Sequence, residues 1–235
     1  MLKKYSADNH GKGNHGWLNS LFHFSFAEYY NSERRNFGVL RVINDDLVVP
    51  DFGFDVHPHR DMEIISYVVS GELTHGDSLG NKNTISRGQI QYMSAGKGVM
   101  HSEYNLGNDT LRFLQIWIHP NQKGLDPHYG DYKFDWDVRK NRLLHMVSPT
   151  VGHAPVQINA DTNIYALELE KGKSVEFKVA VNRQAYLVQI EGMAKINGIH
   201  LNARDALESV EESLAIKALD TSHFLIIEMK KDTIS

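Results

Sequence analysis

The sequence predicts an all-β protein made of two units with little helix. Short apolar segments recur about every 8–12 residues between turns rich in Gly, Asn, Asp and Ser, which is typical of a β-sandwich or barrel. The chain has 235 residues, a length that allows one large β domain or two of ordinary size. Asn197-Gly198 lies between two short apolar segments and is the strongest local hairpin signal in the chain.

In the first half, each expected strand is apolar or alternating and ends at a polar or glycine turn. These strands cover residues 37–43, 63–69, 72–75, 83–86, 89–93 and 111–118. The following stretch, 119–141, is polar and contains two prolines and two glycines, which is typical of a connection between domains. We therefore expect an N-terminal domain over residues 1–130, a linker over 131–145 and a C-terminal domain over 146–235.

The second half repeats the style of the first. Its expected strands cover residues 163–169, 174–180, 185–190, 194–196, 199–201 and a closing strand at 223–229. Residues 203–219 have a helix-forming composition, yet 214–218 alternate as a strand would. Because the surrounding segments are all β, we expect a turn followed by a strand in this region.

Composition excludes several classes of function. The chain contains no cysteine, which removes disulfides, thiolate metal sites, iron–sulfur clusters and cysteine nucleophiles. Its net charge of −4 argues against a dedicated nucleic-acid binder, which usually presents a basic face. The N-terminus lacks the apolar region of a signal peptide, and no apolar run approaches the length of a membrane span. We expect a cytoplasmic protein that binds neither nucleic acid directly nor a membrane.

Two short motifs suggest a metal site held by nitrogen and oxygen. His57-Pro58-His59 places two imidazoles at positions i and i+2, which share one face of an extended strand about 6.6 Å apart. His101-Ser102-Glu103 repeats that spacing with a third imidazole and a carboxylate. Two such pairs on neighbouring strands would provide three nitrogens and one oxygen, a ligand set that suits Fe(II), Mn, Co, Ni, Cu or Zn.

Each motif also has a simpler interpretation. A lone His-x-His pair in a β protein is most often two surface or edge histidines, and it is the second pair and the glycines before it that favour a metal site. Glu63 is a competing ligand, since it shares parity with His57 and His59, but a straight strand would carry it about 13 Å beyond His59. We therefore favour Glu103 as the ligand and assign Glu63 to an ion pair, with Arg60 or Lys82 as its partner, or to a supporting role.

The other histidines are weaker candidates. His75 and Asp77 share a face, and we expect a satisfied pair in the core, with the orientation of a metal ligand as the alternative. The histidines of the second half show no paired spacing with a carboxylate. We therefore expect the C-terminal domain to be metal-free.

Three segments together resemble the pirin family of the cupin superfamily, and most of all the bacterial pirin-like proteins described as quercetinases. They are Phe22-His-Phe-Ser-Phe-Ala-Glu28-Tyr-Tyr, His57-Pro-His59-Arg-Asp-Met-Glu63 and Met93-Ser-Ala-Gly96-Lys-Gly98-Val-Met-His101-Ser-Glu103-Tyr-Asn105. The resemblance implies a bicupin fold, that is, two stacked antiparallel β-barrels (double-stranded β-helices). It implies one metal in the N-terminal barrel, which we expect to be Fe(II), with ligands that match His57, His59, His101 and Glu103.

The resemblance also implies an activity. Quercetinases are metal-dependent dioxygenases that use dioxygen to open the central ring of flavonols such as quercetin and release carbon monoxide. In this chain Glu103 would take the hydroxyl proton of the substrate. The alternative that the family offers is an iron-binding, redox-sensitive regulatory protein that binds a transcription factor or a metabolic enzyme.

Overall fold

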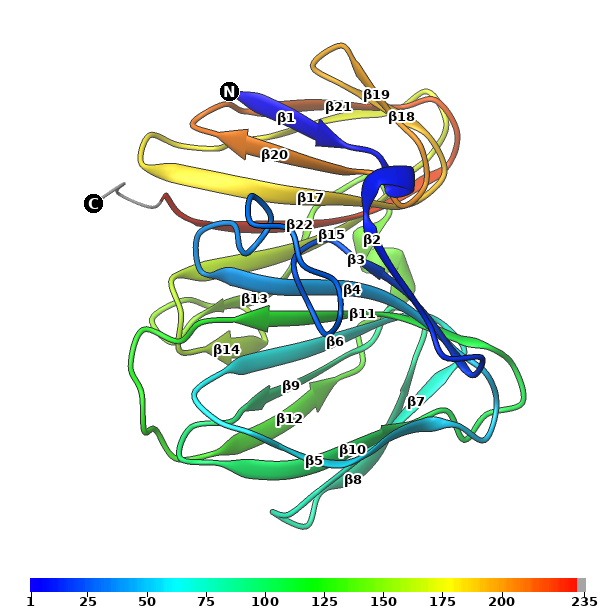
Figure 1. The fold of residues 1–235 in the computed structure, drawn as a ribbon. Helices are drawn as coiled ribbons and strands as arrows, with labels where there is room; N and C mark the ends of the chain where they lie inside the picture. Colours follow the sequence, from blue (N-terminus) through cyan, green and yellow to red (C-terminus); the bar gives the residue numbers. More distant parts are fainter. Residues whose placement is uncertain (232–235) are drawn as a thin grey trace. The chain divides into compact units, whose positions relative to one another are not determined.

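The computed structural model describes residues 1–231, whose regular structure is almost entirely antiparallel β-strand (Figure 1). The strands form two seven-stranded sheets and two four-stranded sheets. Two single-turn 3-10 helices, η1 (Ala7–Asn9) and η2 (Trp136–Arg139), complete the regular elements of the described chain. The predicted all-β class is confirmed.

The described chain divides into two compact units. The N-terminal unit consists of residues 11–134 and 158–160, and the C-terminal unit of residues 1–10, 135–157 and the chain from residue 161 onward. The division is therefore not a single cut near residues 131–145. The first residues join the second half because β1 (Leu2–Tyr5) pairs with β20 (Ala206–Val210).

The N-terminal unit contains one sheet of each size. Across its seven-stranded sheet the order is β12 (His128–Tyr132), β9 (Ile90–Ser94), β6 (Glu63–Ser70), β11 (Leu111–Ile118), β4 (Leu40–Val48), β3 (Leu18–Phe22) and β2 (Gly11–Asn14). Across its four-stranded sheet the order is β5 (Gly53–His59), β10 (Val99–Tyr104), β7 (Glu72–Asp77) and β8 (Lys82–Ser86).

The C-terminal unit has the same two sheet sizes. Its seven-stranded sheet runs β1, β20, β17 (Arg183–Glu191), β22 (Ser222–Lys230), β15 (Thr162–Leu169), β13 (Leu144–Pro149) and β14 (Val156–Ile158). Its four-stranded sheet runs β16 (Ser174–Phe177), β21 (Leu214–Ala218), β18 (Ala194–Ile196) and β19 (Ile199–Leu201).

Local signals explain several of these elements. Asn197 and Gly198 adopt φ values of 46° and 89° and join β18 to β19, as a two-residue hairpin turn requires. The ambiguous region 203–219 forms β20 and β21 and no helix, so the preference for strand is confirmed. Some strands were not expected from the sequence, and β12 is one of them, because it lies inside the polar stretch 119–141. As the edge strand of its sheet it pairs only with β9 and therefore needs no strict apolar alternation.

The two units differ in their interiors. In the N-terminal unit, buried apolar residues form separate clusters, one around Leu111 and Phe113 and another around Ile64 and Met93. In the C-terminal unit, one large cluster of buried apolar residues includes side chains from both sheets. Phe224 is one of its members. The N-terminal unit also buries polar side chains on inward strand positions, and these form the candidate site.

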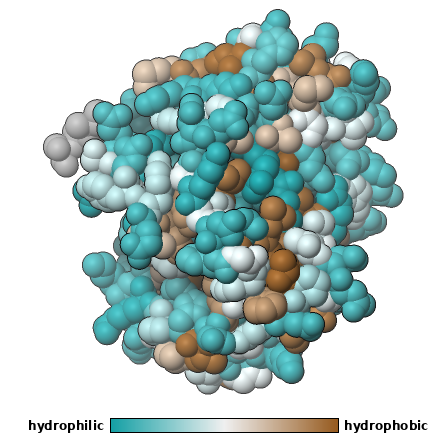
Figure 2. All heavy atoms as spheres, turned by 45° about the vertical axis from the view of Figure 1, so that its right-hand side comes forward, coloured by the Kyte–Doolittle hydropathy of each residue, from teal (hydrophilic) through white to brown (hydrophobic). Residues whose placement is uncertain are grey.

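Figure 2 shows one face on which hydrophilic residues dominate and hydrophobic residues form separate patches. The exposed large apolar residues are spread along the sequence, as Tyr30, Val56, Val151 and Val181 illustrate. Within residues 1–231 no helix is long and apolar enough to span a bilayer.

Candidate metal centre

Two neighbouring strands carry the residues singled out from the sequence. His57 and His59 lie on β5, and His101 and Glu103 lie on β10. His101 lies directly opposite His57 in the antiparallel register, and a bulge follows it, so that Glu103 lies opposite Phe54. His101 and Glu103 are each only 1% exposed. The i, i+2 spacing therefore places both side chains on the buried face of β10, as the sequence predicts.

A turn that contains glycine directly precedes β10. Gly96 has a φ of 44°, in the left-handed region, and a Cβ at this position would collide with the carbonyl oxygen of Leu125. Only glycine fits such a close approach without strain. The turn thus explains why glycines precede the second motif.

Three imidazoles converge at one point. The ring centroids of His57, His59 and His101 lie 4.8, 4.5 and 4.8 Å apart (His57–His59, His57–His101 and His59–His101). One ring nitrogen from each lies within 4.8 Å of the other two. Nitrogen atoms this close together can bind a single transition-metal ion, to which imidazole nitrogen is a common ligand.

The hydrogen bonds orient these rings for a cation. Nδ1 of His57 donates to the backbone carbonyl of Asp55 at 2.7 Å, which fixes the tautomer and leaves Nε2 with its lone pair free. That Nε2 faces Nε2 of His101 at 3.1 Å. Two facing ring nitrogens can share one proton at most in a hydrogen bond, whereas both can serve as ligands to a metal. The arrangement therefore fits a metal ion.

Electrostatics favour neutral imidazoles here. Burial, followed by the neighbouring His101 and His57, lowers the pKa of His59 to about 4. Burial, followed by His57 and His75, lowers the pKa of His101 to about 3. Both rings are thus uncharged at neutral pH, and the neutral imidazole is the form that binds metals.

Glu103 lies beside the three histidines and is held by the opposite sheet. Its Oε1 accepts hydrogen bonds from Ser66 Oγ at 2.7 Å and Gln91 Nε2 at 2.6 Å, and its Oε2 accepts one from Gln115 Nε2 at 2.7 Å. Among the described residues, the group close enough to share an ion contains only His57, His59 and His101. The assignment of Glu103 as a fourth ligand thus stays a prediction.

The donors to Glu103 form a row across the sheet, and sequence analysis missed them. Gln115 lies opposite Ser66, and Ser66 lies opposite Gln91, on the adjacent strands β11, β6 and β9. All three are buried, at 6%, 0% and 4% exposure. A polar residue at an inward position of an otherwise apolar strand was the available signal. Such groups are expensive to bury unless they are hydrogen-bonded.

Glu63, the competing ligand, belongs to a different environment. It lies on β6 and accepts hydrogen bonds from Ser94 Oγ at 2.8 Å and Asn159 Nδ2 at 3.3 Å. Burial raises its pKa. The suggested partner Arg60 forms an ion pair with Asp61. Glu63 therefore supports packing at the end of β6 through neutral donors.

His75 approaches the three histidines from β7. Its Nε2 lies 2.9 Å from Oδ2 of Asp77, which gives the expected buried pair. The His75 ring is 5.4 Å from that of His101 and stacks on Tyr129 at 4.2 Å. This pair therefore packs directly against a candidate ligand.

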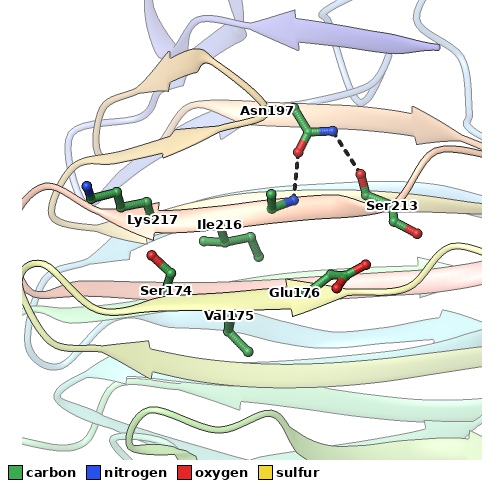
Figure 3. Close-up of a pocket in the computed structure, with 8 residues that line it drawn as sticks. Ser174, Val175, Glu176, Asn197, Ser213, Ile216 and Lys217 are labelled. Carbon is green, nitrogen blue, oxygen red and sulfur yellow. Dashed lines mark hydrogen bonds between the residues drawn. The ribbon is translucent and has the colours of Figure 1, made fainter.

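A hollow in the C-terminal unit has different chemistry (Figure 3). It has a volume of about 550 Å³ and lies against β16 and β21. Asn197 closes one side, donating from Nδ2 to Ser213 O at 2.8 Å and accepting from Ala215 N at 2.6 Å. Its lining includes Glu176 and Lys217 and no histidine. Within the part of the chain that the structure describes, the histidine group that could hold a metal ion belongs to the N-terminal unit.

Both halves of the chain match protein-family models. The Pirin model matches residues 5–118, and a model described as the quercetinase C-terminal cupin domain matches residues 145–229. A Pseudomonas aeruginosa protein provisionally named quercetin 2,3-dioxygenase is 44% identical over 231 residues, which cover 97% of this chain and 100% of that protein. A protein of Escherichia coli (strain K12) named quercetin 2,3-dioxygenase is 37% identical over 231 residues, with coverage of 97% and 99%.

A solved structure shows the same similarity in three dimensions. The crystal structure of the bacterial pirin YhhW from Escherichia coli in complex with nickel(II) has a TM-score of 0.93 to this chain at 35% identity. The match covers 99% of this chain and 100% of that one.

Proposed function

The chain belongs to the pirin family, and on this premise we propose that it is a metal-dependent dioxygenase that cleaves the central ring of flavonols such as quercetin. The observation that carries the proposal is the convergence of three imidazoles, with nitrogens within 4.8 Å of one another, beside a buried carboxylate. Relatives named quercetin 2,3-dioxygenase support the choice of reaction and substrate.

The proposed metal ligands are His57, His59, His101 and Glu103. Three nitrogens and one carboxylate oxygen suit a divalent first-row ion. We propose Fe(II), and the same donors suit Zn, Ni, Co, Mn or Cu. The nickel(II) complex of the related bacterial pirin supports a transition-metal site and leaves the choice among these ions to elemental analysis.

When bound, a divalent ion supplies positive charge that lowers the pKa of a flavonol hydroxyl and favours its anionic form. Glu103 is the group that accepts the released proton. Ser66, Gln91 and Gln115 are neutral donors, so they orient its carboxylate without cancelling its charge. Dioxygen is the oxidant: both of its atoms enter the ring-opened product, one ring carbon leaves as carbon monoxide, and no external reductant is required.

The test uses protein loaded with one metal at a time under anaerobic conditions. Oxygen uptake and carbon monoxide release are then measured with quercetin. We expect turnover in the wild-type protein and none above background in folded His57→Ala and His101→Ala variants. His153→Ala, which changes an exposed histidine of the C-terminal unit, is the matched control and should retain full activity. Wild-type turnover in both site variants would refute the proposal.

The regulatory alternative is tested by a separate titration and a binding assay. A flavonol titration that leaves the metal's absorbance unchanged, together with redox-dependent binding of a protein partner, would favour it over catalysis. The coupling would then require two states of the protein that differ in affinity for the partner.

A further inference from the structure

The N-terminal unit contains a cavity next to the residues that surround Glu103. It has a volume of about 300 Å³, at the small end of the range for pockets that hold drug-sized ligands. Its apolar wall is largely aromatic and comes from β3, β5 and the segments beside them. The aromatic residues are Trp17, Phe22, Phe26 and Phe54.

Three contacts connect this aromatic cavity to the candidate metal centre. Gln115 lines the cavity and also donates to Oε2 of Glu103. Phe54 lies directly opposite Glu103 in the pairing of β5 with β10. Phe26 packs edge-on against Trp117 at 5.4 Å, and Trp117 packs edge-on against His59 at 4.9 Å. A ligand in the cavity would therefore lie beside the residues that are proposed to hold the metal.

Asn44 supplies an unused acceptor on the wall of the cavity. It lies on β4 directly opposite Gln115, so it extends the polar row that holds Glu103. Its side chain is 2% exposed, and no described residue donates a hydrogen bond to its Oδ1. Asp46, on the same strand and also on the wall, has partners within the protein.

A buried acceptor without a donor is expensive, because it has lost its water without replacement. The cost is recovered if a bound ligand donates to that atom. A hydroxyl group is the natural donor at this position. An anionic group would face both the carbonyl oxygen of Asn44 and the carboxylate of Asp46, and charge repulsion would exclude it.

We propose that the aromatic cavity is the ring-binding subsite of the centre and that Asn44 is its specificity-determining residue, accepting a hydrogen bond from a ring hydroxyl of a planar polyphenol. This inference rests on the proposed function for the part of the ligand that faces the metal. The aromatic wall provides apolar contact for the ring system, and Asn44 distinguishes hydroxylated rings from bare ones.

The test compares two flavonols that share the 3-hydroxyl group. Quercetin carries further hydroxyls on its outer rings, and 3-hydroxyflavone carries none. Dissociation constants are measured by calorimetry on the metal-loaded full-length protein without oxygen, so that no turnover occurs. The variants are Asn44→Leu, which keeps the volume and removes the acceptor, and Asn19→Leu, an exposed asparagine on the neighbouring strand β3, as the matched control.

We expect Asn44→Leu to weaken quercetin binding about tenfold and to change 3-hydroxyflavone binding less than about twofold, since one buried hydrogen bond is lost for the first ligand only. Asn19→Leu should change neither constant. If Asn44→Leu fails to fold, as judged by its thermal melt, Asn44→Ala is judged by the same criterion. Equal effects on both ligands, or no effect on either, would overturn the assignment.

The two proposals fail separately. If quercetin is bound with the Asn44 dependence but no oxygen is consumed, the subsite stands and the dioxygenase function falls. If oxygen is consumed and Asn44→Leu changes the dissociation constants of both flavonols equally, the proposed function stands and the proposed subsite is wrong.

Discussion

The two units share one order of strands but differ in the side chains that point into their interiors. The four-stranded sheets run β5-β10-β7-β8 and β16-β21-β18-β19, so β10 and β21 occupy the same place. On β10 the buried positions include His101 and Glu103, whereas on β21 they are Leu214, Ile216 and Ala218. The same alternation of inward and outward residues thus carries a candidate metal centre in one unit and an apolar core in the other.

The seven-stranded sheets make the same contrast. In their matching orders, β11 corresponds to β22. The inward row of the N-terminal unit includes Gln115, whereas β22 contributes Phe224 and Ile226 to the apolar cluster. The strand framework thus permits either interior, and a few inward side chains decide whether a unit can carry a reactive site.

The largest effect on stability should come from the apolar interior. Phe224 is fully buried in the C-terminal unit, so Phe224→Ala should lower the free energy of unfolding by about 3–5 kcal/mol. Because it lies outside the candidate centre, the variant that remains folded should keep its metal content, measured by elemental analysis. If the folded variant lost its metal, the conclusion that the apolar interior and the candidate metal centre belong to separate units would be wrong.

Removal of the metal should destabilise the protein through the N-terminal unit. A ligand that binds only the folded state stabilises it by mass action, by about 4 kcal/mol when free metal exceeds the dissociation constant about a thousandfold. A strong chelator should therefore lower the melting temperature of the wild-type protein and leave that of His101→Ala unchanged. An unchanged wild-type melt, with metal loss confirmed, would count against the site.

The polar row should matter more than a buried glutamine elsewhere. Gln115→Leu removes one of the donors to Glu103, and a hydrogen bond to a charged group contributes about 1.5–3 kcal/mol. We expect a loss of that size in urea unfolding, together with slower flavonol turnover. The control is Gln189→Leu on β17, where Gln189 donates to the backbone of Glu191. It should leave turnover unchanged, and equal losses of turnover would contradict a role specific to Glu103.

The smallest effect concerns pH. In the metal-free folded protein, burial and the neighbouring rings lower the pKa of His59 to about 4 and that of His101 to about 3, against about 6.5 in the unfolded chain. Below pH 6.5 the unfolded chain thus binds protons that the folded one does not. Stability should therefore fall as pH drops from 6.5 towards 4 and be unaffected by these groups above that window.

Urea unfolding of chelated protein at several pH values measures this effect. A His59→Gln/His101→Gln variant should lose less stability over the same window, because the two titrating rings are gone. Identical pH dependence in the two proteins would show that these histidines do not carry the proton linkage.

The sequence alone determined the all-β class and the pairs of candidate ligands. Alternation and turn residues act within a few positions, so Asn197-Gly198 and the strands beside it could be predicted from neighbours in the chain. The His57/His59 and His101/Glu103 pairs were visible for the same reason, since a spacing of two fixes a shared face of a strand.

Tertiary structure alone decided what surrounds those ligands. The row of Asn44, Gln115, Ser66 and Gln91 is assembled from β4, β11, β6 and β9, whose pairing brings together residues far apart in the chain. The same pairing gives Glu103 its three donors and places Glu63 opposite Ser94, which donates to it. Local patterns specify which face a side chain occupies, whereas only the register between distant strands specifies which side chains meet on that face.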